Sequence, residues 1–223
     1  MANKLYVIGS SSSIWKRCHV LLQGQIELVP LVFTNSLPLM RIEDYSNYIQ
    51  SCLKQHIVES FSSEPKILFV HRRRDIDQAA SRALYGEAEF LLTVLTYLKS
   101  NFASSHAILI GSVTGELVSQ HADEGYHYQK DFQRSVLRFR SVAYPKHRIN
   151  MIELGASFQK YSDDECSTSM RAYYGTIKQC LNTDGLPSYQ DLARAIRYFV
   201  DSGPFQTGNI LTLDNSLRHL QRF

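Results

Sequence analysis

The sequence has little of what a metal site or a disulfide framework requires. Its four cysteines, Cys18, Cys52, Cys166 and Cys180, are far apart, and no two of them form a C-x-x-C pair. Its eight histidines show no i,i+4 pairing and no carboxylate at ligand spacing. We therefore expect neither a metal site nor a disulfide framework.

The sequence also lacks a strong charge of one sign and a long apolar run. A formal net charge of +3 is too small to indicate nucleic acid or an anionic membrane surface as a partner. No run approaches the roughly eighteen apolar residues of a membrane span, and MANKLYVIG at the start is not a basic-then-apolar leader. These features favour a cytoplasmic protein without nucleic-acid or membrane partners.

Short apolar runs rich in β-forming residues alternate with segments of helical spacing. The expected strands are 4–9, 28–33, 38–42, 66–71, 106–111, 148–153 and 209–214. Near-continuous apolar strands joined by helices predict a Rossmann-type, doubly wound α/β fold, with a seven-stranded parallel sheet and helices on both faces. The chain of 223 residues is 44% hydrophobic and shows no linker or repeat, so we expect one domain over 1–223.

Three of the helical segments predict how they pack. Ile49, Leu53 and Ile57 recur at every fourth residue and share one face. Residues 88–100 are apolar nearly all round, which predicts burial on two sides, in the core or in a subunit contact. A further helix carries apolar residues on one face, namely Phe132, Val136, Phe139 and Ala143.

A polar loop with one glycine follows the first expected strand. Residues 9–15 read GSSSSIW, and the turn from this strand into a helix is where α/β proteins usually hold a nucleotide phosphate. The residues alone leave two interpretations open. The loop is either a rebuilt anion site at a helix N-terminus or a solvated turn.

A tyrosine and a lysine four residues apart follow the strand that ends near Ser112. Tyr126 and Lys130 lie one turn apart on one helix face. An ammonium this close lowers the pKa of a phenol from about 10, and such a phenol can exchange a proton with an alcohol or a carbonyl oxygen. A nearby serine hydroxyl can hold the same oxygen. The alternative is an amphipathic helix with incidental polar residues.

Ser112 followed by Tyr126-x-x-x-Lys130 resembles the catalytic signature of the short-chain dehydrogenase/reductase family. The segments ILIGSVTG (108–115), RINMIELGASF (148–158) and TGNILTLDNS (207–216) resemble strand segments of that family in the same order. The resemblance implies a Rossmann-type fold that uses NAD(H) or NADP(H) to interconvert a carbonyl and an alcohol on a small molecule. It also implies a homo-oligomer, a dimer or tetramer, paired through the helix of the Tyr–Lys motif and the preceding helix.

The resemblance implies a role for each matching residue. Tyr126 would be the general acid/base, Lys130 would lower its pKa and hold the nicotinamide ribose, and Ser112 would orient the substrate oxygen. The implied cofactor-binding residues are Gly9, Ser11, Ser12, Ser13, Ile14, Thr34, Ile42, Arg72, Tyr126, Lys130, Gly155 and Ser157. The second strand ends at Phe33-Thr34-Asn35 without the acidic residue expected at an NAD ribose, which favours NADP(H) over NAD(H).

Departures from the family pattern leave a second function open. The family loop reads T-G-x-x-x-G-x-G, and here Ser13 and Trp15 stand at its last two glycines. We expect the indole either to swing outward or to push the helix from the sheet. His-Arg-Arg-Arg replaces N-N-A-G at 71–74, and Leu84 or Tyr85 falls near the place of the family's asparagine. The alternative is an inactive pseudo-enzyme without cofactor, a binding or assembly subunit that pairs with itself or with an active paralogue.

Overall fold

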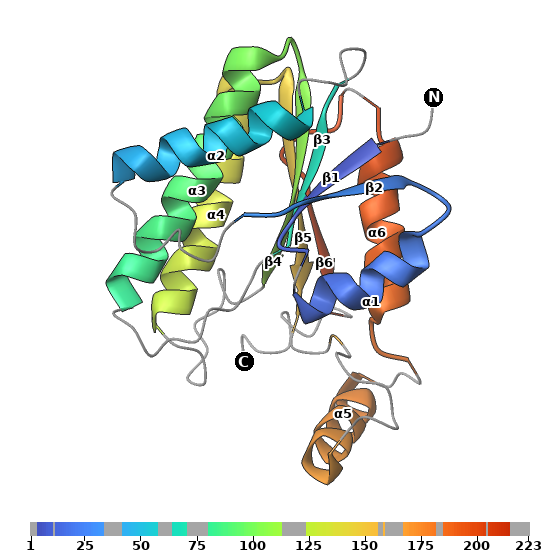
Figure 1. Ribbon diagram of the computed structural model, residues 1–223. Helices are drawn as coiled ribbons and strands as arrows, with labels where there is room; N and C mark the ends of the chain where they lie inside the picture. The colour runs from blue at the N-terminus through green and yellow to red at the C-terminus, as the bar shows by residue number, and fades with distance from the viewer. Residues whose placement is uncertain are drawn as a thin grey trace.

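Six parallel strands form one sheet in the computed structural model (Figure 1). The structure describes residues 4–10, 12–33, 42–57, 64–70, 80–112, 124–155, 158, 167–181, 185–203 and 205–214. The strands are β1 (Lys4–Ile8), β2 (Glu27–Leu31), β3 (Lys66–Phe69), β4 (Ser105–Ser112), β5 (His147–Leu154) and β6 (Ile210–Leu213). The helices are α1 (Ser13–Leu22), α2 (Ile42–Ile57), α3 (Ala80–Asn101), α4 (Glu124–Ala143), α5 (Thr168–Leu181) and α6 (Tyr189–Asp201).

The strand order confirms the doubly wound parallel sheet expected from the sequence. The order is β2-β1-β3-β4-β5-β6, so the direction of winding reverses between β1 and β3. The strand expected at 38–42 is not among the described strands. Residues 38–41 lie outside the described part of the chain, and Ile42 begins α2, so its assignment to a strand was wrong. The helical spacing of Ile49, Leu53 and Ile57 extends back to this residue, and all three side chains are buried as predicted.

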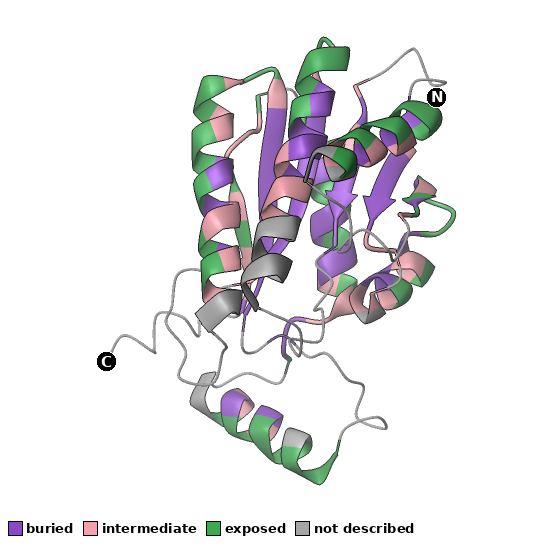
Figure 2. Cartoon of the chain, turned by 60° about the vertical axis from the view of Figure 1, so that its left-hand side comes forward, coloured by how far each residue is buried: buried purple, intermediate pink, exposed green. Residues whose placement is uncertain are grey.

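Helices cover both faces of the sheet. Figure 1 shows α1 and α6 on one face and α2, α3 and α4 on the other. Successive side chains of β1 enter different cores, because Leu5 and Val7 pack beneath α1 and α6 while Tyr6 and Ile8 face the other layer. Burial on both faces explains why the central strands β1, β3, β4 and β5 read as apolar runs, and Figure 2 shows the middle of the sheet buried. The edge strands β2 and β6 are less buried.

Helix α3 lies between α2 and α4, which confirms that its apolar residues are buried on two sides. Val94 and Leu98 are almost fully buried there. The apolar face expected on α4 is only partly buried. Val136 enters the core, whereas Phe139 is 64% exposed. The surface beside Phe139 therefore keeps an apolar character that the core does not use.

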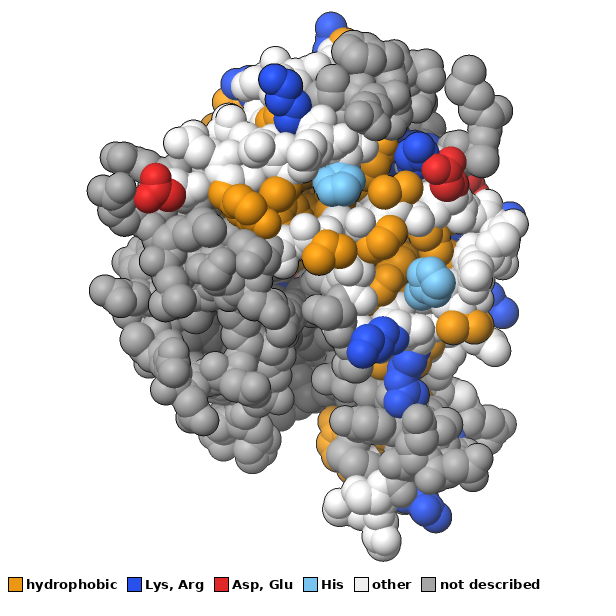
Figure 3. All heavy atoms as spheres, viewed as in Figure 1, with side chains coloured by type: hydrophobic (Ala, Val, Ile, Leu, Met, Phe, Trp, Pro, Cys, Tyr) orange, Lys and Arg blue, Asp and Glu red, His pale blue; other side chains and the backbone are white. Residues whose placement is uncertain are grey.

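Strand β2 is an edge of the sheet among the described strands. Pro30 is exposed on this strand, and proline is compatible with an edge because it has no N–H for a further strand to pair with. Figure 3 shows hydrophobic side chains interspersed with polar ones on this side of the molecule. Val20 of α1 and Val32, just after β2, are 69% and 71% exposed.

A polar network closes the amino ends of the central strands. Arg148 donates to Glu64 and to the carbonyl oxygens of Ser202 and Gly203, which follow α6. Beside it the fully buried His106 and Asn150 are joined through His106 Nε2 and Asn150 Nδ2, 2.9 Å apart. These bonds attach the end of α6 to β4 and β5.

Helix α6 has a side-chain cap at its start, and α5 is separate from the other helices. The Asp191 carboxylate accepts hydrogen bonds from the backbone N–H and the hydroxyl of Ser188, which caps α6. Helix α5 lies apart from the two helical layers in Figures 1 and 2. No helix among the described residues is long and apolar enough to cross a membrane.

Candidate functional site

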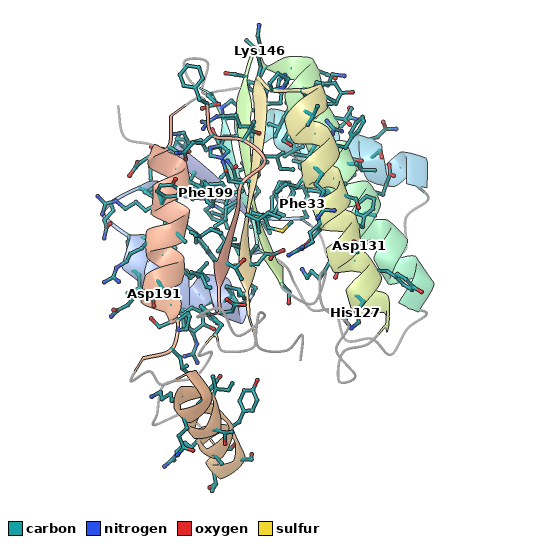
Figure 4. All side chains as sticks on the ribbon, turned by 180° about the vertical axis from the view of Figure 1, so that it is seen from behind. Phe33, His127, Asp131, Lys146, Asp191 and Phe199 are labelled. Atoms are coloured by element: carbon teal, nitrogen blue, oxygen red, sulfur yellow. The ribbon has the colours of Figure 1, made fainter. Side chains whose placement is uncertain are left out.

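The carboxyl ends of the strands bring the sequence-predicted site segments to one edge of the sheet. Gly9 follows β1, Ser112 ends β4, and Gly155 follows β5. Because all strands are parallel, these ends share an edge, and α1 and α4 begin beside it. Figure 4 labels His127 on the first turns of α4 at this edge, and Lys146 at the opposite edge, just before β5.

Gly9 makes the turn between β1 and α1 at the point where strand order reverses. Its φ is +87°, and a Cβ at this position would lie 2.1 Å from the carbonyl oxygen of Val70, which follows β3. The turn continues as the Ser12 N–H donates to the Gly9 carbonyl oxygen at 3.0 Å. The first glycine of the loop is therefore required by backbone conformation and by the neighbouring strand.

Ser12 is the N-cap of α1. Its Oγ accepts a hydrogen bond from the Trp15 N–H at 3.1 Å. The cap thus binds one of the N–H donors at the helix start, that of Trp15. The N–H groups of Ser13 and Ile14 come before Trp15, in the first turn of the helix. The positive end of the helix dipole thus lies at the carboxyl edge of the sheet, where an anion would be stabilised.

Trp15 is buried beneath α1. The side chain is 5% exposed and packs in the cluster that includes Leu5, Cys18 and Leu22. Its ring also makes an edge contact with His19, at a centroid distance of 5.6 Å. Of the two placements expected from the sequence, the outward one is wrong, because the indole is buried on the face of α1 that helical spacing also gives to Cys18 and Leu22. The indole therefore fills the space between helix and sheet.

Ser112 ends β4 in register with Leu154 of β5. The preceding residue, Gly111, is buried, and a Cβ there would lie 2.7 Å from Met151 Sδ and 3.4 Å from Glu153 Cγ. The two strands therefore approach closely just before the serine. Ser112 itself is half-buried, so its hydroxyl stands at the boundary between the sheet and the edge.

Helix α4 confirms that residues 126 and 130 lie one turn apart. Lys130 is 2% exposed, and its Nζ donates to Gln133 Oε1 at 3.1 Å. The backbone of Tyr126 belongs to α4, and its side chain lies outside the described part of the structure. Tyr128 is on another face of the helix and is 61% exposed. A buried lysine on the sheet-facing side is what the Tyr–Lys interpretation requires.

A buried ion pair beside Lys130 was not predicted from the sequence. Arg134 Nε and Nη2 donate to the two carboxylate oxygens of Glu153, each at 2.5 Å. The two side chains are 6% and 0% exposed. The available signal was a carboxylate within the expected strand RINMIE, since a carboxylate buried in a sheet requires a partner. The sequence did not indicate which cation supplies it.

Gly155 lies where the ends of β5 and β6 meet. Its N–H donates to the Leu213 carbonyl oxygen at 3.1 Å, and a Cβ would lie 1.9 Å from Asp214 Cβ. No larger residue fits there. The Gly155 carbonyl oxygen in turn accepts from the N–H of Phe158, which is buried. The chain thus leaves this strand end through a close backbone turn.

Several other candidate residues cannot be placed. Ser11, Thr34, Arg72 and Ser157 lie outside the described residues, and the side chains of Ser13 and Ile42 are not described either. The predicted binding roles of these residues remain predictions. Within the described part of the chain, no group of His, Cys, Asp and Glu side chains could hold a metal ion.

Comparison with known proteins identifies the fold. No family model and no curated protein matches the sequence. Among solved structures, a short chain dehydrogenase family protein from Francisella tularensis matches with 16% identity over 98% of this chain and 99% of that one, at a TM-score of 0.66. A dehydrogenase/reductase from Sinorhizobium meliloti matches with 14% identity over 96% and 95%, at 0.68. A 4-hydroxyisoleucine dehydrogenase complexed with NADH matches with 17% identity over 95% and 97%, at 0.67.

Proposed function

We propose that this chain, which has the fold of the short-chain dehydrogenase/reductase proteins, is an NAD(P)(H)-dependent oxidoreductase that interconverts a carbonyl and an alcohol. One observation carries the proposal. Helix α4 holds Lys130 buried one turn after Tyr126, at the edge of the sheet where β4 ends in Ser112. Three residue types that this chemistry needs are thereby brought to one edge.

Each of the three residues has a distinct role in the proposal. Tyr126 gives its phenolic proton to the oxygen of a carbonyl during reduction and takes it back during oxidation. The Lys130 ammonium, one turn away, stabilises the phenolate and so lowers the pKa of Tyr126. The Ser112 hydroxyl donates to the same substrate oxygen and orients it. A bound nicotinamide cofactor supplies or accepts the hydride.

The loop after β1 is the proposed binding site for the diphosphate of a dinucleotide. Gly9 brings the backbone to the switch point of the sheet, and α1 directs its N-terminal N–H groups to the same edge. The burial of Trp15 keeps the indole between α1 and the sheet, so the loss of the third glycine does not place a ring at the helix start. Ser13 at the second glycine adds a hydroxyl that can donate to a phosphate.

We also propose a preference for NADP(H) over NAD(H). The segment after β2 reads Phe33-Thr34-Asn35 and lacks a carboxylate to bind the ribose hydroxyls of NAD. Arg72 follows the neighbouring strand β3 in sequence and is the proposed partner of the additional phosphate. Ile42 would contact the adenine, and Gly155 and Ser157 would lie on the nicotinamide side.

A second copy of the chain is the proposed partner of the α3–α4 face. A shallow groove beside these helices is lined mainly by apolar and aromatic residues, with one serine and one arginine: Leu92, Ser135, Val136, Phe139, Arg140 and Tyr144. Phe139 and Val142 are 64% and 83% exposed, more apolar surface than a helix facing water requires. Phe139→Asp should shift the sedimentation coefficient to that of a monomer. Phe205→Asp, at a 96% exposed residue after α6, is the matched control and should not.

Nucleotide binding is the experiment that tests the oxidoreductase proposal. The protein is titrated with NADPH and NADH by calorimetry and by energy transfer from Trp15, its only tryptophan. Ser13→Asp should retain the fold, because an acidic residue stabilises a helix start, yet repel the diphosphate. Gln50→Asp, exposed on α2, is the charge-matched control and should bind normally.

The outcomes separate the two functions. Micromolar binding that Ser13→Asp weakens and Gln50→Asp does not would support the dinucleotide site. If neither nucleotide binds at millimolar concentration, the oxidoreductase proposal is wrong. The inactive binding or assembly subunit would then be the better description of this chain.

A further inference from the structure

The outward surface of α4 carries a stripe of exposed residues. Asp131, Ser135, Phe139 and Val142 recur at intervals of three or four residues, with Arg138 beside Phe139, so they share one side of the helix. The other side of α4 packs on α3 and on the sheet. Two of the five residues, Ser135 and Phe139, also line the groove described above. This outer stripe therefore belongs to the face proposed to bind a second copy.

The outer stripe carries charges of opposite sign on the two sides of Ser135. Asp131 lies four residues before Ser135, and Arg138 lies three residues after it. Among the described residues, neither charged side chain has an ion-pair or hydrogen-bond partner, so both charges are available to another molecule. Lys99, over the Tyr144 ring, and Arg140 add positive charge at the Arg138 end. The face is thus acidic before Ser135 and basic after it.

This charge pattern determines the direction in which two copies of α4 can meet. In a two-fold dimer the same surface lies on both partners, so every contact is made twice with the roles exchanged. Parallel helices would bring Asp131 near its own copy and Arg138 near its own copy, and like charges that meet are unfavourable. Antiparallel helices that cross near Ser135 place Asp131 of each copy opposite Arg138 of the other. The charges therefore favour the antiparallel arrangement.

The uncharged residues of the outer stripe fit the same arrangement. Ser135 is small, so two helices can approach closely where it meets its own copy. Phe139 and Val142 are 64% and 83% exposed, and the N-terminal half of the other α4 would cover them. Removing this apolar surface from water favours association, while the charges fix the direction. An axis near Phe139 instead would bring the two Arg138 side chains together.

We propose that two copies of this chain pair through antiparallel α4 helices about a two-fold axis at Ser135, with reciprocal Asp131–Arg138 ion pairs. The inference rests on the self-association proposed above for the α3–α4 face, and it adds the direction and the register. It does not depend on nucleotide chemistry. Because Lys130 is buried on the inner side of the same helix, α4 serves the proposed active site on one side and the second copy on the other.

Exchange of the two charges tests the direction of pairing. Sedimentation equilibrium of the full chain gives the dissociation constant of the dimer. Asp131→Arg and Arg138→Asp should each raise this constant about tenfold, because like charges then meet at two symmetric positions. The double variant Asp131→Arg/Arg138→Asp should return it to near the wild-type value. Arg194→Asp, on α6 at a side chain that is 78% exposed, is the matched charge reversal and should leave it unchanged.

A disulfide tests the register. In Ser135→Cys the two thiols meet at the axis, so mild oxidation should link the dimer covalently on a non-reducing gel. Val142→Cys lies seven residues from the axis, so its two thiols would be about 20 Å apart along the helices and should not be linked. The wild-type chain, oxidised alongside, reports any linkage through its four native cysteines.

Each arm can overturn the proposal. It is wrong if the wild-type chain stays a monomer at its highest soluble concentration, if the double charge variant pairs no better than the single variants, or if Ser135→Cys is linked no more than Val142→Cys. All substituted residues are exposed, so the variants should keep the fold, which circular dichroism checks. Nucleotide titration of the wild-type chain is a separate measurement. Pairing as expected without nucleotide binding would overturn the oxidoreductase proposal alone, and nucleotide binding by a monomer would overturn the pairing alone.

Discussion

The two edges of the sheet each bury an arginine paired with a glutamate, but the two pairs lie in different surroundings. At the amino edge Arg148 contacts Glu64 at 2.6 Å and donates at 2.8 Å to the Gly203 carbonyl oxygen, so it is held by side chain and backbone together. At the carboxyl edge Arg134 contacts Glu153 beside Lys130. The first arrangement closes the loop after α6, whereas the second arranges charge next to a candidate active site.

The two edges also differ in how the backbone turns there. At the carboxyl edge Gly9 and Gly155 leave no space for a Cβ, so the chain makes close turns without side chains. At the amino edge the buried His106 and Asn150 fill the space, and Asn150 Nδ2 donates to the carbonyl oxygen of Gln206. The carboxyl edge, where the ligand site is proposed, thus has two backbone turns that leave no room for a side chain.

The largest expected effect is on the carboxyl edge. Tyr126→Phe should lower the rate of carbonyl reduction by about 10²–10⁴-fold, because the proton donor is lost, and should leave the unfolding free energy nearly unchanged. Tyr128→Phe, at a 61% exposed residue on the same helix, is the control and should retain the rate. Equal rates for the two variants, measured as NADPH oxidation over a panel of carbonyl compounds, would contradict the role of Tyr126.

The amino edge should show the opposite behaviour. Arg148→Met removes the contacts to Glu64, Ser202 and Gly203 and should lower the unfolding free energy by about 3 kcal/mol, since it leaves buried acceptors unpaired. Nucleotide affinity of the folded protein should be unchanged. Arg194→Met, whose side chain is 78% exposed, should change stability by less than about 0.5 kcal/mol in urea denaturation. A variant at residue 148 that lost affinity without losing stability would break the distinction between the edges.

Most of the fold was predictable because apolar runs indicate strands and helical spacing indicates helices from local sequence alone. The expected strands at 4–9 and 106–111 and the helix face of Ile49, Leu53 and Ile57 are confirmed. Phe139 shows the limit of this reasoning. Its spacing matches a buried face, but spacing does not say whether a face packs on its own sheet or remains exposed, as this one does.

The candidate site was predictable only where sequence position determines geometry. The pair at 126 and 130 follows from helix periodicity, and the buried Lys130 agrees with it. The motif left two placements open for the Trp15 indole, and the helical spacing that places it with Cys18 and Leu22 agrees with the buried one. Glu153 and Arg134 come from different elements, and only the folded arrangement decides which cation meets a buried carboxylate.

Substitution of two glycines with similar φ angles can distinguish the cost of a strained backbone from the cost of a steric clash. Gly9 has φ +87°, and the Val70 carbonyl oxygen would lie 2.1 Å from an added Cβ, whereas Gly24 has φ +81° and nothing within 4 Å. Gly24→Ala should therefore cost about 1 kcal/mol of unfolding free energy for the left-handed conformation. Gly9→Ala should cost about 3 kcal/mol, because the turn must also move away from β3. Equal costs in urea denaturation would show that the turn relaxes freely.

A pH dependence of stability is expected at the amino edge. Burial, with the nearby charges of Arg148 and Lys66, lowers the pKa of His106 to about 3. The folded state therefore holds the ring neutral, while the unfolded chain takes up a proton below about pH 6.5. The unfolding free energy is therefore not reduced by this ring above that pH. It falls as the pH decreases toward 3, and the loss reaches about 2 kcal/mol at pH 5.

His106→Gln keeps an acceptor for Asn150 without titrating, so it should lose less stability than wild type between pH 7.5 and 5, whereas the exposed His56→Gln should follow wild type. Urea denaturation at the two pH values checks this, and an unchanged slope in His106→Gln would place the acid sensitivity elsewhere than this buried ring.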